Sequence, residues 1–344
     1  MKIAVIGYGG VGKALIRLLD DKKELLSKDN LDIQVNYIIE YYGGIYQPEG
    51  IDLKELINFT KDEKDITKYK SYGDKNITLE TILKNKDIDL AVLMTPTNKE
   101  TGEPGLSIVK SLLNAGIHVV ISDKGPAMIG YRELSEIAKK NEVQFCIGCT
   151  TGGALPTING GLMDMAGSEI LSIEGVLNGT TNFILKEMED NQVSYEAALK
   201  KAQDFGIAET NPTLDVEGWD TAGKLLILTN VHMGLSKTIK DIEVEGITKL
   251  TVEDINKAKA EGKKYKLVGK TTFNGKDYKM TVKLEKLGAD HLLYNVEGKN
   301  KAVRYTCDSL GDLVIIGGAS GVTPAAASIL RDIVNINRGY KFCR

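Results

Sequence analysis

The chain has 344 residues, 42% of them hydrophobic and 26% charged, with a formal net charge of −3. This length suits two domains with separate cores, and the balanced charge argues against nucleic acid or an anionic membrane as the main partner. No apolar run reaches transmembrane length and the first ten residues do not look like a signal peptide, so a cytoplasmic protein is expected.

The amino-terminal segment has the pattern of a dinucleotide-binding unit, with an apolar strand at 2–6, the sequence GYGGVG, and a helix from 11 to 19. In a GxGxxG loop the first glycine permits a tight turn, the second lets the backbone approach a pyrophosphate, and the third allows close packing of helix on strand. The helix N-terminus favours the phosphate charge. The expected cofactor contacts in this loop are Gly7, Gly9, Gly10, Val11 and Gly12.

A second strand, 33–39, ends at Glu40. In this fold an acid at that place binds the ribose hydroxyls and repels a 2′-phosphate. Tyr41 and Tyr42 follow, with no arginine for the phosphate, so the sequence favours NAD over NADP. Two alternatives stay open: Glu40 is a surface glutamate, or Lys54 turns toward a phosphate.

Two further strand ends carry polar residues. The strand 89–94 is closed by Thr95-Pro96-Thr97-Asn98, and the strand 118–122 is followed by Asp123-Lys124-Gly125-Pro126. Such loops line the cleft where a nicotinamide lies, although Lys124 could also be a surface lysine. The glycine- and threonine-rich sequence GCTTGGALPTING then marks a change of domain. We expect a nucleotide-binding domain at 1–150, a second domain at 151–312, and a segment at 313–344 that returns to the first domain.

In the second domain, Asn274-Gly275 predicts a hairpin between strands at 264–272 and 277–285. A second hairpin is expected between 291–296 and 301–306. A strand at 313–316 and the sequence GGASG lead to a last helix at 324–334.

The segment 206–230 is the most informative, because it concentrates acids around one lysine. From about Gly218 it reads as a helix, on which Asp220 and Lys224 share a face before an apolar run enters a core. A lysine among carboxylates suits binding of a zwitterionic amino acid and transfer of a proton. The alternative is an ordinary capped helix with solvated charges.

The four cysteines include a CxxC pair, Cys146 and Cys149, which raises the possibility of zinc or redox chemistry. A zinc site would need a second ligand pair, and the sequence has none. Buried structural thiols are the favoured interpretation, and no side-chain metal site is expected.

Four segments together resemble homoserine dehydrogenase over nearly the whole chain: LNGTTNFIL (177–185), GIAETNPTLDVEGWDTAGK (206–224), TPTNKETGEPG (95–105) and GGASG…AAASILRD (317–332). The resemblance implies an α/β protein with a Rossmann-type doubly wound nucleotide-binding domain and a mixed α/β substrate and dimerisation domain. It implies NAD(P)-dependent interconversion of L-homoserine and L-aspartate 4-semialdehyde, in threonine, methionine and isoleucine biosynthesis, by a homodimer. The chain ends soon after the last helix, so a short form without a C-terminal regulatory domain is expected.

The resemblance also implies residue roles. The proton donor and acceptor is Lys224, and the second essential lysine is Lys124. The substrate is held by Glu209, Asp215 and Asp220. The nicotinamide part of the cofactor is contacted by Thr95, Lys124, Gly206 and Gly321.

The sequence departs from the family pattern in its last glycine loop, at Ala319 and Ser320, and at two places near the candidate site. The family loop EAxVGGGxP binds sodium through its glutamate and backbone carbonyls, but Gly148 replaces that glutamate here. The remaining weak candidates are the carbonyls of Thr151, Gly153 and Leu155, so a bound monovalent cation is doubtful. The second departure is Asp123, where asparagine is usual, next to Lys124.

Two rival functions are weighed against this one. An aldehyde-oxidising dehydrogenase would need a cysteine nucleophile, for which Cys149 is the candidate, but no histidine is placed in sequence to activate it. A non-catalytic NAD-binding protein would leave Lys224 and its acids dispensable. Assaying L-homoserine oxidation with and without a phosphate acceptor separates the three.

Overall fold

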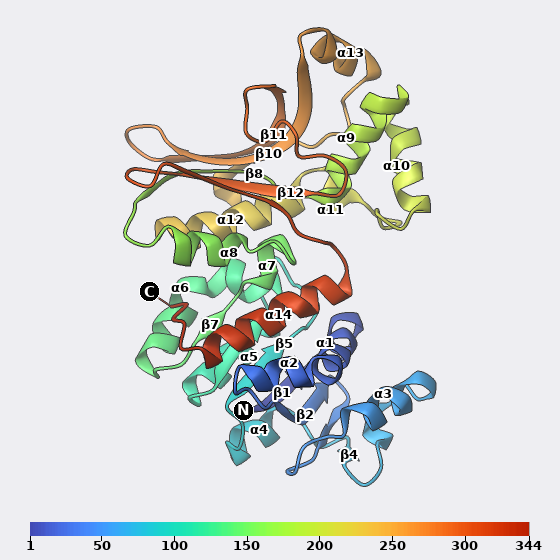
Figure 1. The fold of residues 1–344 in the computed structure, drawn as a ribbon, viewed down its shortest axis with the longest axis vertical. Coiled ribbons are helices and arrows are strands. Elements are labelled where there is room, and N and C mark those ends of the chain that lie inside the picture. Colours follow the sequence, from blue (N-terminus) through green and yellow to red (C-terminus); the bar gives the residue numbers. More distant parts are fainter. Residues whose placement is uncertain (344) are drawn as a thin grey trace. The chain divides into compact units, whose positions relative to one another are not determined.

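Two sheets organise residues 1–343, which this computed structural model describes (Figure 1). The first lies in a unit formed by residues 1–154 and the chain from Gly321 onward, and the second in a unit formed by Leu155–Ser320. These limits differ slightly from the expected ones, because the strand 312–317 pairs within the second sheet. Within residues 1–343, no helix combines the length and apolar character needed to span a membrane.

The first unit contains a seven-stranded sheet of order β4-β3-β2-β1-β5-β6-β7, parallel from β2 to β7 and antiparallel at β3 and β4. Its strands are β1 (Lys2–Ile6), β2 (Gln34–Glu40), β3 (Gly43–Tyr46), β4 (Gly73–Asp74), β5 (Leu90–Leu93), β6 (His118–Ile121) and β7 (Phe145–Cys146). Its helices are α1 (Gly10–Asp21), α2 (Lys23–Lys28), α3 (Leu53–Asp62), α4 (Leu79–Asn85), α5 (Gly105–Asn114), α6 (Lys124–Lys140), α7 (Cys149–Gly152) and α14 (Val322–Asn337).

The central strands of this sheet are apolar and almost completely buried, as in β5, where all four residues are buried. A parallel sheet covered by helices on both faces requires this pattern. The last helix, α14, lies beside α1 in the same unit (Figure 1). The α/β class and the Rossmann-type arrangement are therefore confirmed. The antiparallel extension through β3 was not expected; it follows the two-residue turn Tyr41-Tyr42.

The second unit contains a six-stranded sheet of order β13-β12-β8-β10-β11-β9. Its strands are β8 (Ile170–Val176), β9 (Ile242–Val244), β10 (Lys263–Phe273), β11 (Tyr278–Gly288), β12 (Lys301–Cys307) and β13 (Asp312–Gly317). Its helices are α8 (Thr157–Asn159), α9 (Gly179–Asn191), α10 (Tyr195–Asp204), α11 (Thr213–Val216), α12 (Trp219–Met233) and α13 (Val252–Ala260). Helix α12 packs on this sheet, where Thr229 and Thr271 share a hydrogen bond of 2.7 Å.

The hairpin predicted around Asn274-Gly275 is confirmed as β10 and β11. The second predicted hairpin is wrong, because residues 289–296 form turns, and β12 pairs instead with β8 and β13. Leu293 and Val296, three residues apart, both enter a buried apolar cluster with Val268. In a strand, two residues three positions apart would point to opposite faces, so their burial in one cluster is typical of a turn.

Candidate active site

The three glycines of the GxGxxG loop in the first unit differ in their surroundings: two are closely packed and one has open space beside its backbone. Gly7 has a φ of +94°, and a Cβ there would lie 2.6 Å from the carbonyl oxygen of Met94. A Cβ on Gly12 would lie 2.4 Å from the carbonyl oxygen of Gly7, whereas a Cβ on Gly9 would meet no atom within 4 Å. The first and third glycines are thus required for packing, and the second leaves room for a pyrophosphate at the start of α1.

The carboxylate at the end of β2 turns toward this loop. Glu40 accepts a hydrogen bond from the backbone N–H of Tyr8, between the first two glycines. This is the place where an acid meets the ribose in a dinucleotide-binding unit. Tyr41, the next residue, is 96% exposed and carries no positive charge.

Thr95 and Lys124 are linked through Asp123. Lys124 is the first residue of α6, and its N–H donates to Oγ1 of Thr97 at 3.2 Å. Thr95 donates through Oγ1 to Oδ2 of Asp123 at 3.0 Å. Asp123 is buried and caps α6 by accepting the N–H of Gly125 at 2.9 Å. The acid that departs from the family pattern therefore organises both candidate cofactor residues.

In the second unit, Lys224 and Asp220 lie one turn apart on α12. Nζ of Lys224 is 2.6 Å from Oδ2 of Asp220 and donates to the carbonyl oxygen of Leu177 at 2.8 Å. The side chains are 13% and 10% exposed. A solvated charge cluster would be far more exposed, so the capped-helix alternative for this stretch is not favoured.

Asn178 completes this group and was not among the residues predicted from sequence. Its Nδ2 donates to Oδ1 of Asp215 at 2.7 Å and to Oδ2 of Asp220 at 2.9 Å. Its Oδ1 accepts the N–H of Thr181 at 2.9 Å, which caps α9. We call Asn178, Asp215, Asp220 and Lys224 the Lys224 cluster. The signal in the sequence was an asparagine at the junction of β8 and α9, inside LNGTTNFIL.

Glu209 is not joined to the Lys224 cluster. Its side chain is exposed, its carbonyl oxygen accepts from Gln203 Nε2 at 3.2 Å, and within residues 1–343 no hydrogen bond or ion pair links its carboxylate to the cluster. Gly206, which begins this loop, has a φ of +64°, and a Cβ there would meet no atom within 4 Å.

The loop from Gly148 is held by a buried acid from α14. The N–H of Gly148 donates to Oδ2 of Asp332 at 3.0 Å, and Asp332 is 0% exposed. Thr151 and Gly153 belong to the first unit, and Leu155 begins the second. Among residues 1–343, no group of three or more His, Cys, Asp or Glu side chains is placed to hold a metal ion.

Both cysteines of the CxxC pair are buried, as predicted. Cys146 is 1% exposed, and burial raises the pKa of its thiol well above the ordinary value. Cys149 is 7% exposed, and its Sγ lies 3.5 Å from the carbonyl oxygen of Ala325. The surroundings of Cys146 therefore do not favour the thiolate that a nucleophile requires.

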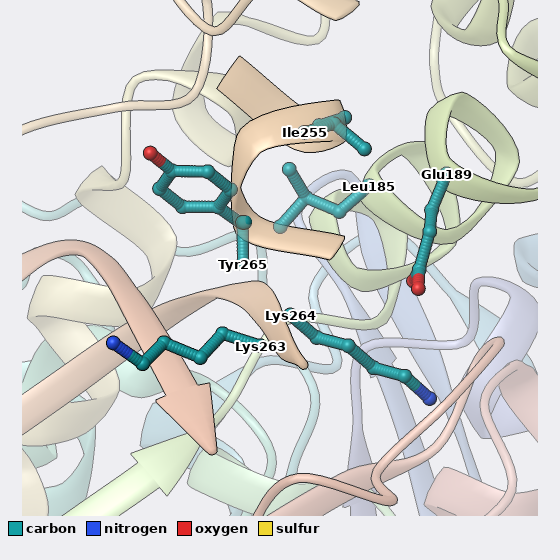
Figure 2. Close-up of a pocket in the computed structure, with 7 residues that line it drawn as sticks. Leu185, Glu189, Ile255, Lys263, Lys264 and Tyr265 are labelled. Atoms are coloured by element: carbon teal, nitrogen blue, oxygen red, sulfur yellow. The ribbon is translucent and has the colours of Figure 1, made fainter. Parts of the chain in front are cut away.

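Two hollows elsewhere are poor candidates for the substrate. One, between α9, α13 and β10, has a cavity volume of about 10 Å³, which holds at most one water molecule (Figure 2). The other has about 480 Å³ but lies at the amino end of β2, the opposite end from Glu40 and the glycine loop.

Residues 156–334 match the sequence model of the family described as Homoserine dehydrogenase, and residues 1–103 match that of Glutamate/Leucine/Phenylalanine/Valine dehydrogenase. The chain is 38% identical to a homoserine dehydrogenase of Methanocaldococcus jannaschii, over 99% of this chain and 100% of that protein. It is 31% identical to an NAD(+)-dependent homoserine dehydrogenase of Pseudomonas canavaninivorans, over 98% and 96%. A solved hyperthermophilic archaeal homoserine dehydrogenase mutant in complex with NADPH is similar in fold, with a TM-score of 0.84, 25% identity, and coverage of 100% of this chain and 99% of that one.

Proposed function

The chain belongs to the homoserine dehydrogenase family, and we propose that it interconverts L-homoserine and L-aspartate 4-semialdehyde with NAD or NADP, a step of threonine, methionine and isoleucine biosynthesis. The observation that carries the proposal is the Lys224 cluster, which pairs a nearly buried lysine with Asp220 at one end of a core helix and links that carboxylate through Asn178 to Asp215.

Each residue of the cluster has a role that suits this substrate. Asp215 and Asp220 provide negative charge for the substrate ammonium group, and Asn178 keeps the two carboxylates in place. Lys224 has three N–H donors, of which one is directed to Asp220 and one to Leu177, so a third can meet the substrate oxygen. Lys224 gives a proton to the carbonyl oxygen in reduction and takes one from the hydroxyl in oxidation. Glu209 acts from its exposed loop as a further substrate contact.

The first unit fits a nicotinamide dinucleotide, because Gly9 leaves open backbone at a helix N-terminus and Glu40 stands at the ribose position. When bound, the dinucleotide supplies or accepts the hydride. The loop residues would contact the pyrophosphate, and Glu40 would accept hydrogen bonds from the ribose. Thr95, Lys124, Gly206 and Gly321 would contact the nicotinamide part.

We further propose that the protein acts as a homodimer and depends little on sodium. At the loop 148–155 the family carboxylate is missing, and Asp332 is engaged with the N–H of Gly148. Carbonyl oxygens alone hold a hard cation weakly. A saturable rise of activity with sodium in a large-cation buffer would contradict the second proposal, and a monomeric mass in light scattering would contradict the first.

The decisive experiment is a spectrophotometric assay of L-homoserine oxidation with NAD and with NADP. Formation of reduced coenzyme that depends on L-homoserine and needs no phosphate is expected. Activity only with L-aspartate 4-semialdehyde and phosphate would instead support the cysteine-dependent oxidation, and coenzyme binding without turnover would support a non-catalytic protein.

A further inference from the structure

Three parts of the first unit meet at the carboxylate of Asp123, which is 2% exposed. The start of α6 contributes the N–H of Gly125 to Oδ1, and the loop after β5 contributes the hydroxyl of Thr95 to Oδ2. The start of α5 comes so close that a Cβ on Gly105 would lie 2.5 Å from Oδ2. The carboxylate is thus a junction between segments that carry Thr95 and Lys124.

The donors around Asp123 match an ionised carboxylate better than an amide. The N–H of Gly125 can only donate. The hydroxyl of Thr97 accepts the N–H of Lys124 and also bonds Asp123, so its hydrogen is directed to the carboxylate. With the hydroxyl of Thr95, three donors converge on two oxygens. Protonation would place a hydrogen on one of these oxygens and remove an acceptor.

The surroundings of Asp123 act on the pKa of its carboxyl in both directions. Burial raises the pKa of the carboxyl, while hydrogen bonds from Gly125, Thr97 and Thr95 and the positive charge of Lys124 lower it, and the net shift is upward. Lys124 is the charged group acting on it; Thr95, Thr97, Gly105 and Gly125 carry no charge. The ionised form therefore depends on the same hydrogen bonds that it organises.

We propose that ionised Asp123 is a positioning residue for the coenzyme: it fixes Thr95 directly and the backbone of Lys124 through Thr97. The proposal rests on the proposed use of a nicotinamide coenzyme, but not on the identity of the second substrate. Asp123 acts without touching the coenzyme, because the contacts to the nicotinamide are assigned to Thr95 and Lys124, which Asp123 positions.

The test is calorimetric titration of NAD⁺ into the full-length chain, without homoserine, between pH 5 and pH 8. The acids of the second unit then have no substrate to bind. For the wild type we expect the affinity to fall by about 10-fold toward pH 5, roughly the loss of one charge-assisted hydrogen bond. Asp123→Asn should bind about 3-fold more weakly at pH 8 and vary less than about 2-fold with pH.

Asp52→Asn is the matched control, because Asp52 caps α3 in the same unit and accepts the N–H of Glu55 at 3.0 Å. It should keep the wild-type pH dependence. Thr97→Val, which removes the hydroxyl between Asp123 and Lys124, should shift affinity in the same direction as Asp123→Asn, and it decides the matter if Asp123→Asn does not fold. Wild-type affinity and pH dependence in the folded variants would overturn the proposal. An expected binding profile with no homoserine oxidation would overturn the proposed function and leave this inference standing.

Discussion

Asn178 and Lys224 are joined through a single atom, Oδ2 of Asp220, which lies 2.9 Å from the amide nitrogen of the first and 2.6 Å from the ammonium nitrogen of the second. The two residues come from the end of β8 and from α12, and Lys224 also donates to Leu177, the neighbour of Asn178. The lysine is therefore fixed from both sides. Its position depends on a strand end as well as on its own helix.

Lys224→Ala should remove turnover while leaving the fold and coenzyme binding nearly intact. Loss of one positioned acid–base group typically lowers kcat by about 10²- to 10⁴-fold. The measurement is kcat for homoserine oxidation, together with NAD⁺ affinity and the thermal midpoint.

Lys200→Ala is the control, since Lys200 forms an i,i+4 ion pair with Asp204 on the exposed face of α10. It removes a similar pair from the same unit and should leave kcat unchanged. A Lys224→Ala variant with near wild-type kcat would rule out the assigned role.

Asn178→Ser should separate the two tasks of Asn178. Serine is as good a helix cap as asparagine, so the free energy of unfolding should change by less than about 1 kcal/mol. Its hydroxyl is too short to bridge Asp215 and Asp220, so both carboxylates lose their common donor. We expect kcat/KM for homoserine to fall by at least about 10-fold, with KM contributing, because displacement of a catalytic group by about 1 Å is costly.

Ser194→Ala provides the comparison, because Ser194 caps α10 by accepting the N–H of Ala197. It should lower the free energy of unfolding by about 1 kcal/mol with unchanged kcat/KM. Equal kcat/KM for Asn178→Ser and the wild type would show that the contacts to Asp215 and Asp220 are only structural.

The sequence was most informative where the chemistry is local. The GxGxxG loop, the acid ending β2 and the lysine one turn after Asp220 all lie within short segments, whose turn and helix geometry follows from neighbouring residues. The hairpin of β10 and β11 could be predicted for the same reason, because its turn residues are adjacent in the sequence. The structure confirms it.

Contacts between distant segments could not be read in this way. Asn178 meets Asp215 and Asp220 across 37 and 42 residues, and an asparagine before a helix suggests only a cap. Asp123 was recognised as unusual, but its bond to Thr95 spans 28 residues. The false hairpin at 291–296 has a related origin: Leu293 and Val296 enter a core cluster that the local pattern does not reveal.

Glu40 should give the protein a preference for NAD over NADP. Similar proteins do not decide the matter, since one is named NAD(+)-dependent and another was solved with NADPH. Two ribose hydrogen bonds to a carboxylate favour NAD, and the same charge repels a 2′-phosphate. Comparing kcat/KM for the two coenzymes tests this preference. Glu40→Ala should lower kcat/KM for NAD by about 10-fold and so reduce the difference between NAD and NADP.

Glu49→Ala is the control, because it removes an exposed glutamate near the other end of β2. It should leave the ratio of kcat/KM for NAD to kcat/KM for NADP unchanged. A strong wild-type preference for NADP would show that Glu40 does not act on the ribose of the bound coenzyme.

Lys266 should make the protein more stable as the pH rises above 8. It is 2% exposed in β10, and its Nζ donates to the carbonyl oxygen of Val296 and, at 3.2 Å, to Oδ1 of Asn182. Burial is the largest cause of its lowered pKa, about 8 against 10.5 for a free lysine; the charge of Glu297 opposes the shift, and that of Lys264 adds to it.

The sign follows from proton binding. Between pH 8 and pH 10.5 the unfolded chain keeps the lysine proton that the folded chain has lost, so the free energy of unfolding increases with pH over this range. The whole increase is on the order of 3 kcal/mol. Lys266→Met removes the titrating group while keeping an unbranched side chain, so this part of the pH dependence should disappear.

Urea unfolding at a series of pH values from 7 to 10.5 measures the effect, and the difference between wild type and variant removes the contribution of other titrating groups. Lys264→Met is the control, because Lys264 lies on the same strand, is 16% exposed and pairs with Glu297. It should retain most of the increase above pH 8, since Lys266 remains and burial, not the charge of Lys264, is the largest cause of its lowered pKa. If Lys266→Met gains as much stability with pH as the wild type, the proton is not lost from Lys266 in this range, and its buried ammonium is stabilised by Val296 and Asn182 more strongly than burial opposes it.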